Sequence, residues 1–474
     1  MSEINEHTAL LPRNEASLPL PGPTLLQEVT QLGKATIPIS ASFALQNIVQ
    51  ALSVITAGSF GPNQLDIASY GFMFASCSGS MVALGGATAL DTLCGQAAAS
   101  SKAQNQPTIL GRHLQQSLFV LSAMFLAVIA PVWIVSGRLF VALGQEEQFA
   151  LETGRFLIYM IPAGYCQMVA ECLKKYIQVQ GQSNSVGWIV LSAAIIGSGA
   201  NPLLIKGTGW GAMGAPLAFL VYQLTTVLSL TILLAKKERE KQTLKLVNSR
   251  AELIDGLGTN LFLGLTGVLT IATEWWSFEI LSMMAAKLVP TEVSAQSILM
   301  SADLIFTTIS LGLGVAASHR IGQLLGGNQA LQARRAAVSP YLLSVILGVI
   351  EFVLIYSFRH RFGYLFTGDA DVVAVTARVL PYMALFQILD LSNGGAGGIL
   401  RGARRNHLSG ACNFLAYYGV GLLMAWLLCF RLGWGLVGLW VGIISGSGAL
   451  LVLQSACIFA LSWNKAAKEA SSHD

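Results

Sequence analysis

Twelve apolar segments of about 20 residues or more fill most of the 474-residue chain, and they constrain its fold more than any other feature. A helix needs about 20 apolar residues to cross the hydrocarbon core of a bilayer. Only 11% of the residues are charged, whereas soluble domains carry about 25%. The sequence therefore predicts an all-α membrane protein with twelve transmembrane helices, at roughly 36–59, 66–91, 114–137, 153–172, 184–206, 211–235, 258–284, 293–318, 337–358, 374–400, 407–430 and 436–462.

Basic residues gather in every second connection between these segments. Because Lys and Arg concentrate in the cytoplasmic loops of membrane proteins, this alternation predicts that both termini are cytoplasmic. The residues assigned in this way to cytoplasmic connections include Lys174, Lys175, Arg320 and Arg401. A run of Lys and Arg in the linker 236–257 indicates a cytoplasmic anchor or a contact with anionic lipid headgroups.

The first 33 residues are polar, are interrupted by proline and lack the apolar stretch of a secretory signal. Within them, EHTALL at 6–11 resembles an acidic dileucine sorting signal for endosomal or vacuolar membranes. Patterns this short also arise by chance. The sequence is therefore compatible with a vacuolar membrane and with the plasma membrane.

The two halves of the chain resemble each other. LGGATALDTLCGQ at 84–96 aligns with LGLGVAASHRIGQ at 311–323, and GWGAMG at 209–214 aligns with GWGLVG at 433–438. An even number of helices separates each pair, so both copies have the same orientation, as in many transporters. We expect two pseudo-symmetric six-helix bundles, and divide the chain into a tail (1–33), an N-terminal bundle (34–235), a linker (236–257), a C-terminal bundle (258–462) and a second tail (463–474).

Glu274 lies in the middle of the seventh segment. A carboxylate at this depth costs about 2.5–3.5 kcal/mol on insertion scales, so its presence needs a reason. In low dielectric a carboxyl group favours its neutral form, and it can then exchange a proton as a cavity faces each side in turn. The alternative is a permanently protonated or hydrogen-bonded side chain that holds two helices together. Glu279 lies about 140° further around the helix, so both residues cannot point into one cavity.

Asp390 begins the stretch DLSNGGAGG at 390–398 in the tenth segment. Glycine and asparagine loosen a membrane helix, and the freed backbone groups must face protein or water. If Asp390 shares a wet pocket with Glu274, the two carboxyl groups should titrate as a coupled pair. Alternatively, the glycines only allow close packing and Asp390 caps the break.

Four more polar residues lie at helical spacing in neighbouring segments. Asn413 and Tyr417 share a face of the eleventh segment, and Gln296 and Asp303 share a face of the eighth. They could line the same pocket, although ordinary hydrogen bonding between helices explains them equally well. A glycine ladder in the twelfth segment predicts a tight helix interface, at Gly438, Gly442 and Gly446.

Nothing in the sequence points to an enzyme. The six histidines lie in tails, loops or helix ends without metal-ligand spacing, and neither a phosphate loop nor a nucleophile elbow is present. The seven cysteines fall in or beside apolar segments, where free cysteine acts as a small hydrophobe. We expect no catalytic residue, no cofactor, no metal and no nucleic-acid partner. Energy should come from an ion gradient, with protons favoured over sodium.

Several motifs in a fixed order resemble the eukaryotic, fungal-like branch of the multidrug and toxic compound extrusion (MATE) family. They are ALDTLCGQ at 89–96, EWWSFE at 274–279, AQS at 295–297, VAASHRIG at 315–322, GILRG at 398–402, NFLAYY at 413–418 and GLVGLW at 435–440. The resemblance implies proton-driven export of amphipathic, often cationic, organic compounds, with an acidic residue at Asp390. Ser301 stands where many animal relatives carry an acidic residue. Gln46, Asn47 and Gln50 occupy the helix in which prokaryotic relatives use aspartate, so coupling should reside in the C-terminal bundle.

We therefore expect a monomeric secondary active transporter with a small-molecule substrate, working by alternating access of a cleft between the bundles. The alternative is a flippase for lipids or lipid-linked precursors, because distant members of the superfamily share the two-bundle plan. A flippase would need a cleft rich in basic residues, and the predicted membrane interior has almost none. Gly-Gln pairs at 95–96 and 322–323 should shape the cytoplasmic gate.

Overall fold

The computed structural model describes residues 23–100, 108–241 and 254–472. Within these ranges the chain forms helices and turns but no strand, and twelve helical spans have the length and composition to cross a membrane. The predicted all-α membrane fold is confirmed.

The first half of the chain contributes six spans, in which π-helical turns join α2 to α3 and α5 to α6. Its helices are α1 (Leu25–Gly58), α2 (Pro62–Ala75), α3 (Met81–Ala97), α5 (Thr108–Met124), α6 (Ala130–Ala142), α7 (Glu147–Val179), α8 (Ser183–Asn201) and α9 (Gly214–Lys241). The second half contributes the other six. Its helices are α11 (Leu257–Ala285), α12 (Pro290–Gly326), α13 (Ala330–Ala336), α14 (Ser339–Phe362), α15 (Ala370–Gly402), α16 (Asn406–Phe414), α17 (Leu422–Trp426), α18 (Gly435–Phe459) and α19 (Trp463–Ser472).

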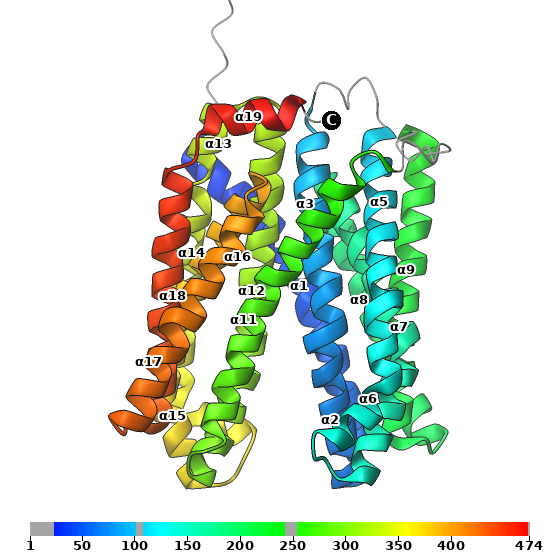
Figure 1. Ribbon diagram of the computed structural model, residues 1–474, viewed down its shortest axis with the longest axis vertical. Coiled ribbons are helices and arrows are strands. Elements are labelled where there is room, and N and C mark those ends of the chain that lie inside the picture. Colours follow the sequence, from blue (N-terminus) through cyan, green and yellow to red (C-terminus); the bar gives the residue numbers. More distant parts are fainter. Residues whose placement is uncertain (1–22, 101–107, 242–253, 473–474) are drawn as a thin grey trace, which may run out of the picture.

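The two halves lie next to each other and meet near one end of the molecule (Figure 1). α12 packs against α1 and α3, and α11 packs against α3, so these contacts join the halves. α19 lies across the end at which α1 begins, which we call the termini side. Toward the opposite end, the far side, α3 and α11 diverge in Figure 1.

Several helices extend beyond their apolar segments on the termini side. α1 begins at Leu25, within the predicted tail, and residues 463–472 form α19, which packs against α12 and α13. α7 continues to Val179, so Lys174 and Lys175 lie in a helix, where both are 3% exposed. Their assignment to a loop was wrong, because hydropathy ends a span at its first charges even where protein partners bury those charges.

Arg320 and Arg401 were assigned to loops for the same reason, and they too lie in helices. α12 continues to Gly326 and α15 to Gly402. The side chain of Arg401 is 15% exposed and that of Arg320 is 30% exposed. The structure therefore places four basic residues inside the helical bundle near the termini side.

Each half has its own hydrophobic core. In the first half, Phe72 packs edge-to-face against Phe156 with ring centroids 5.2 Å apart. In the second, Phe386 packs in the same way against Trp440 at 6.0 Å. A smaller cluster around Phe43 joins α1 to α12 between the halves. Most buried apolar side chains pack against others of their own half. The halves can therefore change their mutual contact while both main cores stay intact.

The predicted glycine ladder of α18 does form a tight interface. A Cβ atom on Gly442 would overlap the backbone of Ala425 in α17, and one on Gly446 would lie 2.7 Å from the Cα atom of Gly421. Side chains at these positions would push α18 away from its neighbours. A Cβ atom on Gly448, in the same helix, would meet no heavy atom within 4 Å, so this glycine provides a matched comparison.

We predict that Gly442→Ala lowers the free energy of unfolding by about 1–3 kcal/mol, the usual cost of overpacking. Gly448→Ala should be neutral or slightly stabilising, because alanine is favoured over glycine within helices by about 0.5–1 kcal/mol. Thermal unfolding of the purified protein in detergent measures both changes. Equal melting temperatures for the two variants would contradict the tight interface.

Candidate functional site

A cavity of about 70 Å³ lies between the two halves. Residues of α1, α3 and α7 line it from the first half, and residues of α11, α12, α15, α16 and α18 line it from the second. Its charged lining groups are Glu274, Lys175 and Arg401. Pockets for drug-sized ligands measure about 300–1,000 Å³, so this cavity is several times smaller. A substrate of that size needs the halves to separate further.

Glu274 reaches the cavity from α11. Thr270, Ile271 and Glu274 share one face of the helix, because residues three and four apart are neighbours on a helix surface, and all three line the cavity. The close approach of α11 to α3 needs glycine: a Cβ atom on Gly267 would overlap the carbonyl oxygen of Gly85. This contact brings the carboxyl-bearing face of α11 against the first half.

Asp303 and Asp390 lie close to Glu274, and the electric fields of both carboxylates reach it. Asp303, on α12, accepts a hydrogen bond of 2.7 Å from Nε2 of Gln387. Asp390, on α15, accepts a bond of 3.4 Å from the hydroxyl of Thr307. Both aspartates are buried. The structure therefore gathers three of the predicted site residues into one group of carboxylates in the second half, with Glu274 at the cavity wall.

Glu279 faces a different direction. Its Oε1 atom accepts a hydrogen bond of 3.4 Å from the thiol of Cys77, which lies in the π turn between α2 and α3. The two glutamates of α11 therefore point to different surroundings, as their separation around the helix predicts. Glu274 belongs to the cavity, and Glu279 belongs to a contact with the first half.

The remaining predicted residues divide between the cavity and ordinary packing. Asn413 lines the cavity and donates a bond of 3.1 Å to the carbonyl oxygen of Thr270. Tyr417 is fully buried, within range of the fields of Glu274 and Asp390. The Oε1 atom of Gln296 accepts a bond of 2.9 Å from the indole of Trp440, so this residue joins α12 to α18.

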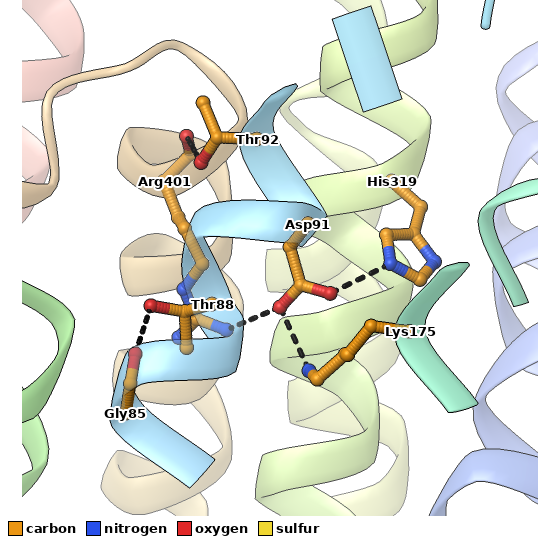
Figure 2. Close-up of polar contacts among 7 residues, drawn as sticks. All are labelled: Gly85, Thr88, Asp91, Thr92, Lys175, His319 and Arg401. Atoms are coloured by element: carbon orange, nitrogen blue, oxygen red, sulfur yellow. Dashed lines mark hydrogen bonds and ion pairs between the residues drawn. The ribbon is translucent and has the colours of Figure 1, made fainter. Parts of the chain in front are cut away.

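An ion cluster around Asp91 was missed by the sequence reasoning. The fully buried carboxylate of Asp91, on α3, lies 2.7 Å from Nζ of Lys175, 2.8 Å from Nε2 of His319 and 3.4 Å from a guanidinium nitrogen of Arg401 (Figure 2). These partners come from α7, α12 and α15. Asp91 had been read only as part of a motif and its partners as loop residues. The available signal was an acidic residue at the end of an apolar segment, together with basic residues just after other apolar segments. This pattern could have indicated buried ion pairs.

The predicted Gly-Gln pairs meet beside this cluster. A Cβ atom on Gly322 would lie 3.2 Å from the backbone of Gly95, so α12 and α3 touch where both carry glycine. The amide of Gln96 donates a bond of 2.9 Å to the carbonyl oxygen of Gly402, and that of Gln323 donates one of 3.0 Å to Val179. Both bonds connect one half of the chain to the other.

The MatE family model matches residues 38–203 and 268–427, which cover most of both halves. The chain belongs to the MatE family. It is 30% identical over 442 residues to an uncharacterized transporter of Schizosaccharomyces pombe, covering 92% of this chain and 80% of that protein. It is 28% identical over 433 residues to the multidrug and toxin extrusion protein 1 of Homo sapiens, covering 90% and 74%.

A solved structure shares the MATE fold over nearly the whole chain. The crystal structure of the eukaryotic MATE transporter AtDTX14 superposes with a TM-score of 0.86 at 27% sequence identity, covering 94% of this chain and 99% of that one. The protein is therefore a multi-pass membrane transporter of the MATE family, which is not a family of enzymes. The predicted two-bundle architecture and the resemblance to eukaryotic MATE proteins are confirmed.

The position of Lys175 inside this MATE protein can be tested by its contribution to stability. We predict that Lys175→Met costs about 3–5 kcal/mol in the free energy of unfolding, because it removes one partner of a buried ion pair. Lys465 is 73% exposed and pairs with Glu469 at 3.9 Å, so Lys465→Met should change stability by no more than about 0.5 kcal/mol. Thermal melting of the two variants measures the difference. Similar melting temperatures for the two variants would contradict the burial of Lys175 and favour a solvated position.

Proposed function

We propose that this MATE transporter exports amphipathic organic cations in exchange for protons by alternating access, and that Glu274 binds the proton and the substrate cation in turn. The supporting observation is the position of its carboxyl group, which lines the cavity between the halves beside Asp303 and Asp390. The name of the human relative, a multidrug and toxin extrusion protein, supports export of drug-like small molecules.

The exchange follows from the cost of placing like charges together in a buried site. Three neighbouring carboxylates with little water around them repel one another, so a proton or an organic cation that neutralises one of them is bound favourably. Both ligands relieve the same repulsion, and they compete for the same group. Protons that arrive from the far side displace the cation there, and loss of the protons on the termini side restores the negative charge that attracts the next cation.

We also propose that the termini side is cytoplasmic, as the distribution of basic residues predicts, in a vacuolar or plasma membrane. The monomer is the transporting unit, because one chain supplies both walls of the cavity. A proton moving down 100 mV releases about 2.3 kcal/mol, and one pH unit adds about 1.4 kcal/mol. Together they would support accumulation of one neutral substrate per proton by several hundredfold. Exchange of one proton for one monovalent cation moves no net charge, so it uses only the pH difference and supports about tenfold accumulation per pH unit.

A lipid flippase is less well supported, although the expectation of an interior without basic residues was wrong. Lys175 and Arg401 line the cavity, but both are paired with Asp91. A flippase needs cations that are free to bind a lipid phosphate. The carboxylate group of the second half fits a cationic substrate instead.

We predict that Glu274→Gln, and likewise Asp390→Asn, reaches the membrane but loses proton-driven export by at least about tenfold, the factor that corresponds to 1.4 kcal/mol. The measurement is efflux of ethidium from proteoliposomes with an imposed pH gradient. Asp371→Asn, which changes an exposed carboxylate in the first turn of the same helix as Asp390, should retain wild-type efflux. Full activity of a Glu274→Gln and Asp390→Asn double variant would refute the proposal.

The coupling ion can be tested with the same proteoliposomes. An imposed sodium gradient at equal pH on both sides should drive no ethidium efflux, whereas a pH gradient without sodium should drive it fully. The reason is that the proposed site consists of carboxyl groups, each of which binds a proton covalently. Efflux driven by a sodium gradient alone would contradict proton coupling and identify sodium as the coupling ion.

A further inference from the structure

We propose that the ion cluster of Asp91, Lys175, His319 and Arg401 is an electrostatic lock between the two halves, and that Arg401 makes the strength of this lock depend on the charge of Glu274. The second part rests on the proposed function, in which Glu274 gains and loses a charge. The first part stands on the geometry of the cluster alone.

The lock consists of ion pairs that cross from one half to the other. Asp91 and Lys175 belong to the first half, whereas His319 and Arg401 belong to the second. The contacts of Asp91 with His319 at 2.8 Å and with Arg401 at 3.4 Å therefore join the halves (Figure 2). Removing one partner of a buried ion pair leaves an uncompensated charge in low dielectric. Separation of the halves at this point must break both contacts.

Hydrogen bonds around the cluster close the same region. The hydroxyl of Thr92, one residue after Asp91, donates a bond of 2.9 Å to the carbonyl oxygen of Arg401 (Figure 2). Glu28, in the first turn of α1, pairs with Arg320 of α12. The cluster thus lies between the cavity and the termini side, within a continuous contact between the halves. Opening the cavity toward the termini side requires the lock to break.

Arg401 and Lys175 connect the lock to the candidate site, because both line the cavity that Glu274 also lines. The field of Arg401 reaches Glu274 and the field of Asp91 reaches Lys175. Apart from His319, the lock contains two positive charges, Lys175 and Arg401, and one negative charge, Asp91. Glu274 supplies the second negative charge. Ionised Glu274, Asp91, Lys175 and Arg401 together therefore carry no net charge.

The charge of Glu274 then decides whether the repulsion between Lys175 of the first half and Arg401 of the second half is offset. Lys175 and Arg401 come from different halves, and the field of Arg401 acts on Lys175 as a like charge. Asp91 and ionised Glu274 offset this repulsion. When a proton or a cationic substrate neutralises Glu274, one positive charge is left in excess and the contact between the halves weakens. The closed state of the termini side is therefore most stable when Glu274 is ionised.

Other charged groups around the site do not cancel this effect. Asp303 and Asp390 act on Glu274 from α12 and α15, and both lie in the second half with it. Glu171 acts on Lys175 from the same helix, but it pairs with Lys174 and adds no net charge. A change in the charge of Glu274 therefore acts directly on Arg401.

The lock can be measured as a distance across the termini side. Spin labels on cysteines introduced at Asn184 of α8 and Leu331 of α13, both exposed, report the separation of the halves by pulsed electron paramagnetic resonance. The measurement uses the full chain with its native cysteines replaced, in lipid nanodiscs without substrate, at a pH where Glu274 is ionised. Arg401→Gln and Asp91→Asn should each raise the ratio of open to closed molecules by about tenfold, within the usual range of coupling between sites. Arg401→Gln leaves Asp91 paired with Lys175 and His319, so it tests the lock even where Asp91→Asn does not fold.

Two comparison variants separate the lock from a general loss of charge. Arg401→Lys keeps the positive charge and should stay closer to wild type than Arg401→Gln. Arg405→Gln removes a nearby guanidinium whose partner Glu469, at 3.0 Å, lies in the same half, and it should leave the distance unchanged. A distance that stays closed in both Arg401→Gln and Asp91→Asn would overturn the lock, as would an equal opening in Arg405→Gln.

The link to Glu274 is tested by combining substitutions. Glu274→Gln should open the termini side about tenfold when Arg401 is present and should have little further effect in Arg401→Gln, a non-additivity that reports direct coupling. Equal effects of Glu274→Gln in both backgrounds would overturn the link. If the variants behave as expected but wild-type distances do not respond to pH, the lock is supported and proton binding at Glu274 is refuted. Loss of ethidium efflux in Glu274→Gln with no change in any distance would refute the link alone.

Discussion

The contacts of Asp91 with His319 and Arg401 hold the two halves together at one end of the molecule. Bulk water is largely excluded from two groups of this cluster, because Asp91 is fully buried and Lys175 is 3% exposed. Such charges are tolerated in the interior only as a complete set, since removal of one leaves another unpaired. Helices α3, α7, α12 and α15 must therefore meet at this point, and the cavity that contains Glu274 lies directly beside their meeting point.

The two halves differ in what they place near the cavity. The second half contributes a group of buried carboxylates, in which Asp303 and Asp390 act on both Glu274 and Glu351 of α14. The first half contributes the pair of Asp91 and Lys175, which is neutral overall. Acidic charge that can be neutralised by a ligand is thus concentrated in one half, opposite a fixed ion pair in the other.

This asymmetry explains how a rigid fold can respond to a small ligand. Each half retains its own apolar core, so relative motion of the halves breaks only the contacts between them. Those contacts combine a small apolar cluster around Phe43, close glycine approaches and the ion pairs of Asp91. The ion pairs are the component whose strength depends on the charge of neighbouring groups. A proton or a cation at Glu274 therefore acts where the barrier to motion is most sensitive to charge.

Much of the fold could be predicted from local sequence. The twelve spans, the internal repeat and the glycine ladder of α18 depend on hydropathy, spacing and small side chains, which act between near neighbours. The position of Glu274 in the membrane was equally evident, because an isolated carboxyl group in an apolar run needs no partner to be noticed. The separation of Glu274 from Glu279 followed from helical geometry alone.

Tertiary structure decided which distant residues meet. Asp91, Lys175, His319 and Arg401 are spread over more than three hundred positions, and nothing local distinguishes a base that continues a helix from one that begins a loop. Gln296 looked like a cavity residue by its spacing to Asp303, but the fold turned it toward Trp440. The sequence by itself determined the spans and the buried acid. Folding determined the pairing, because the energy of a buried charge depends on the partners that other helices bring to it.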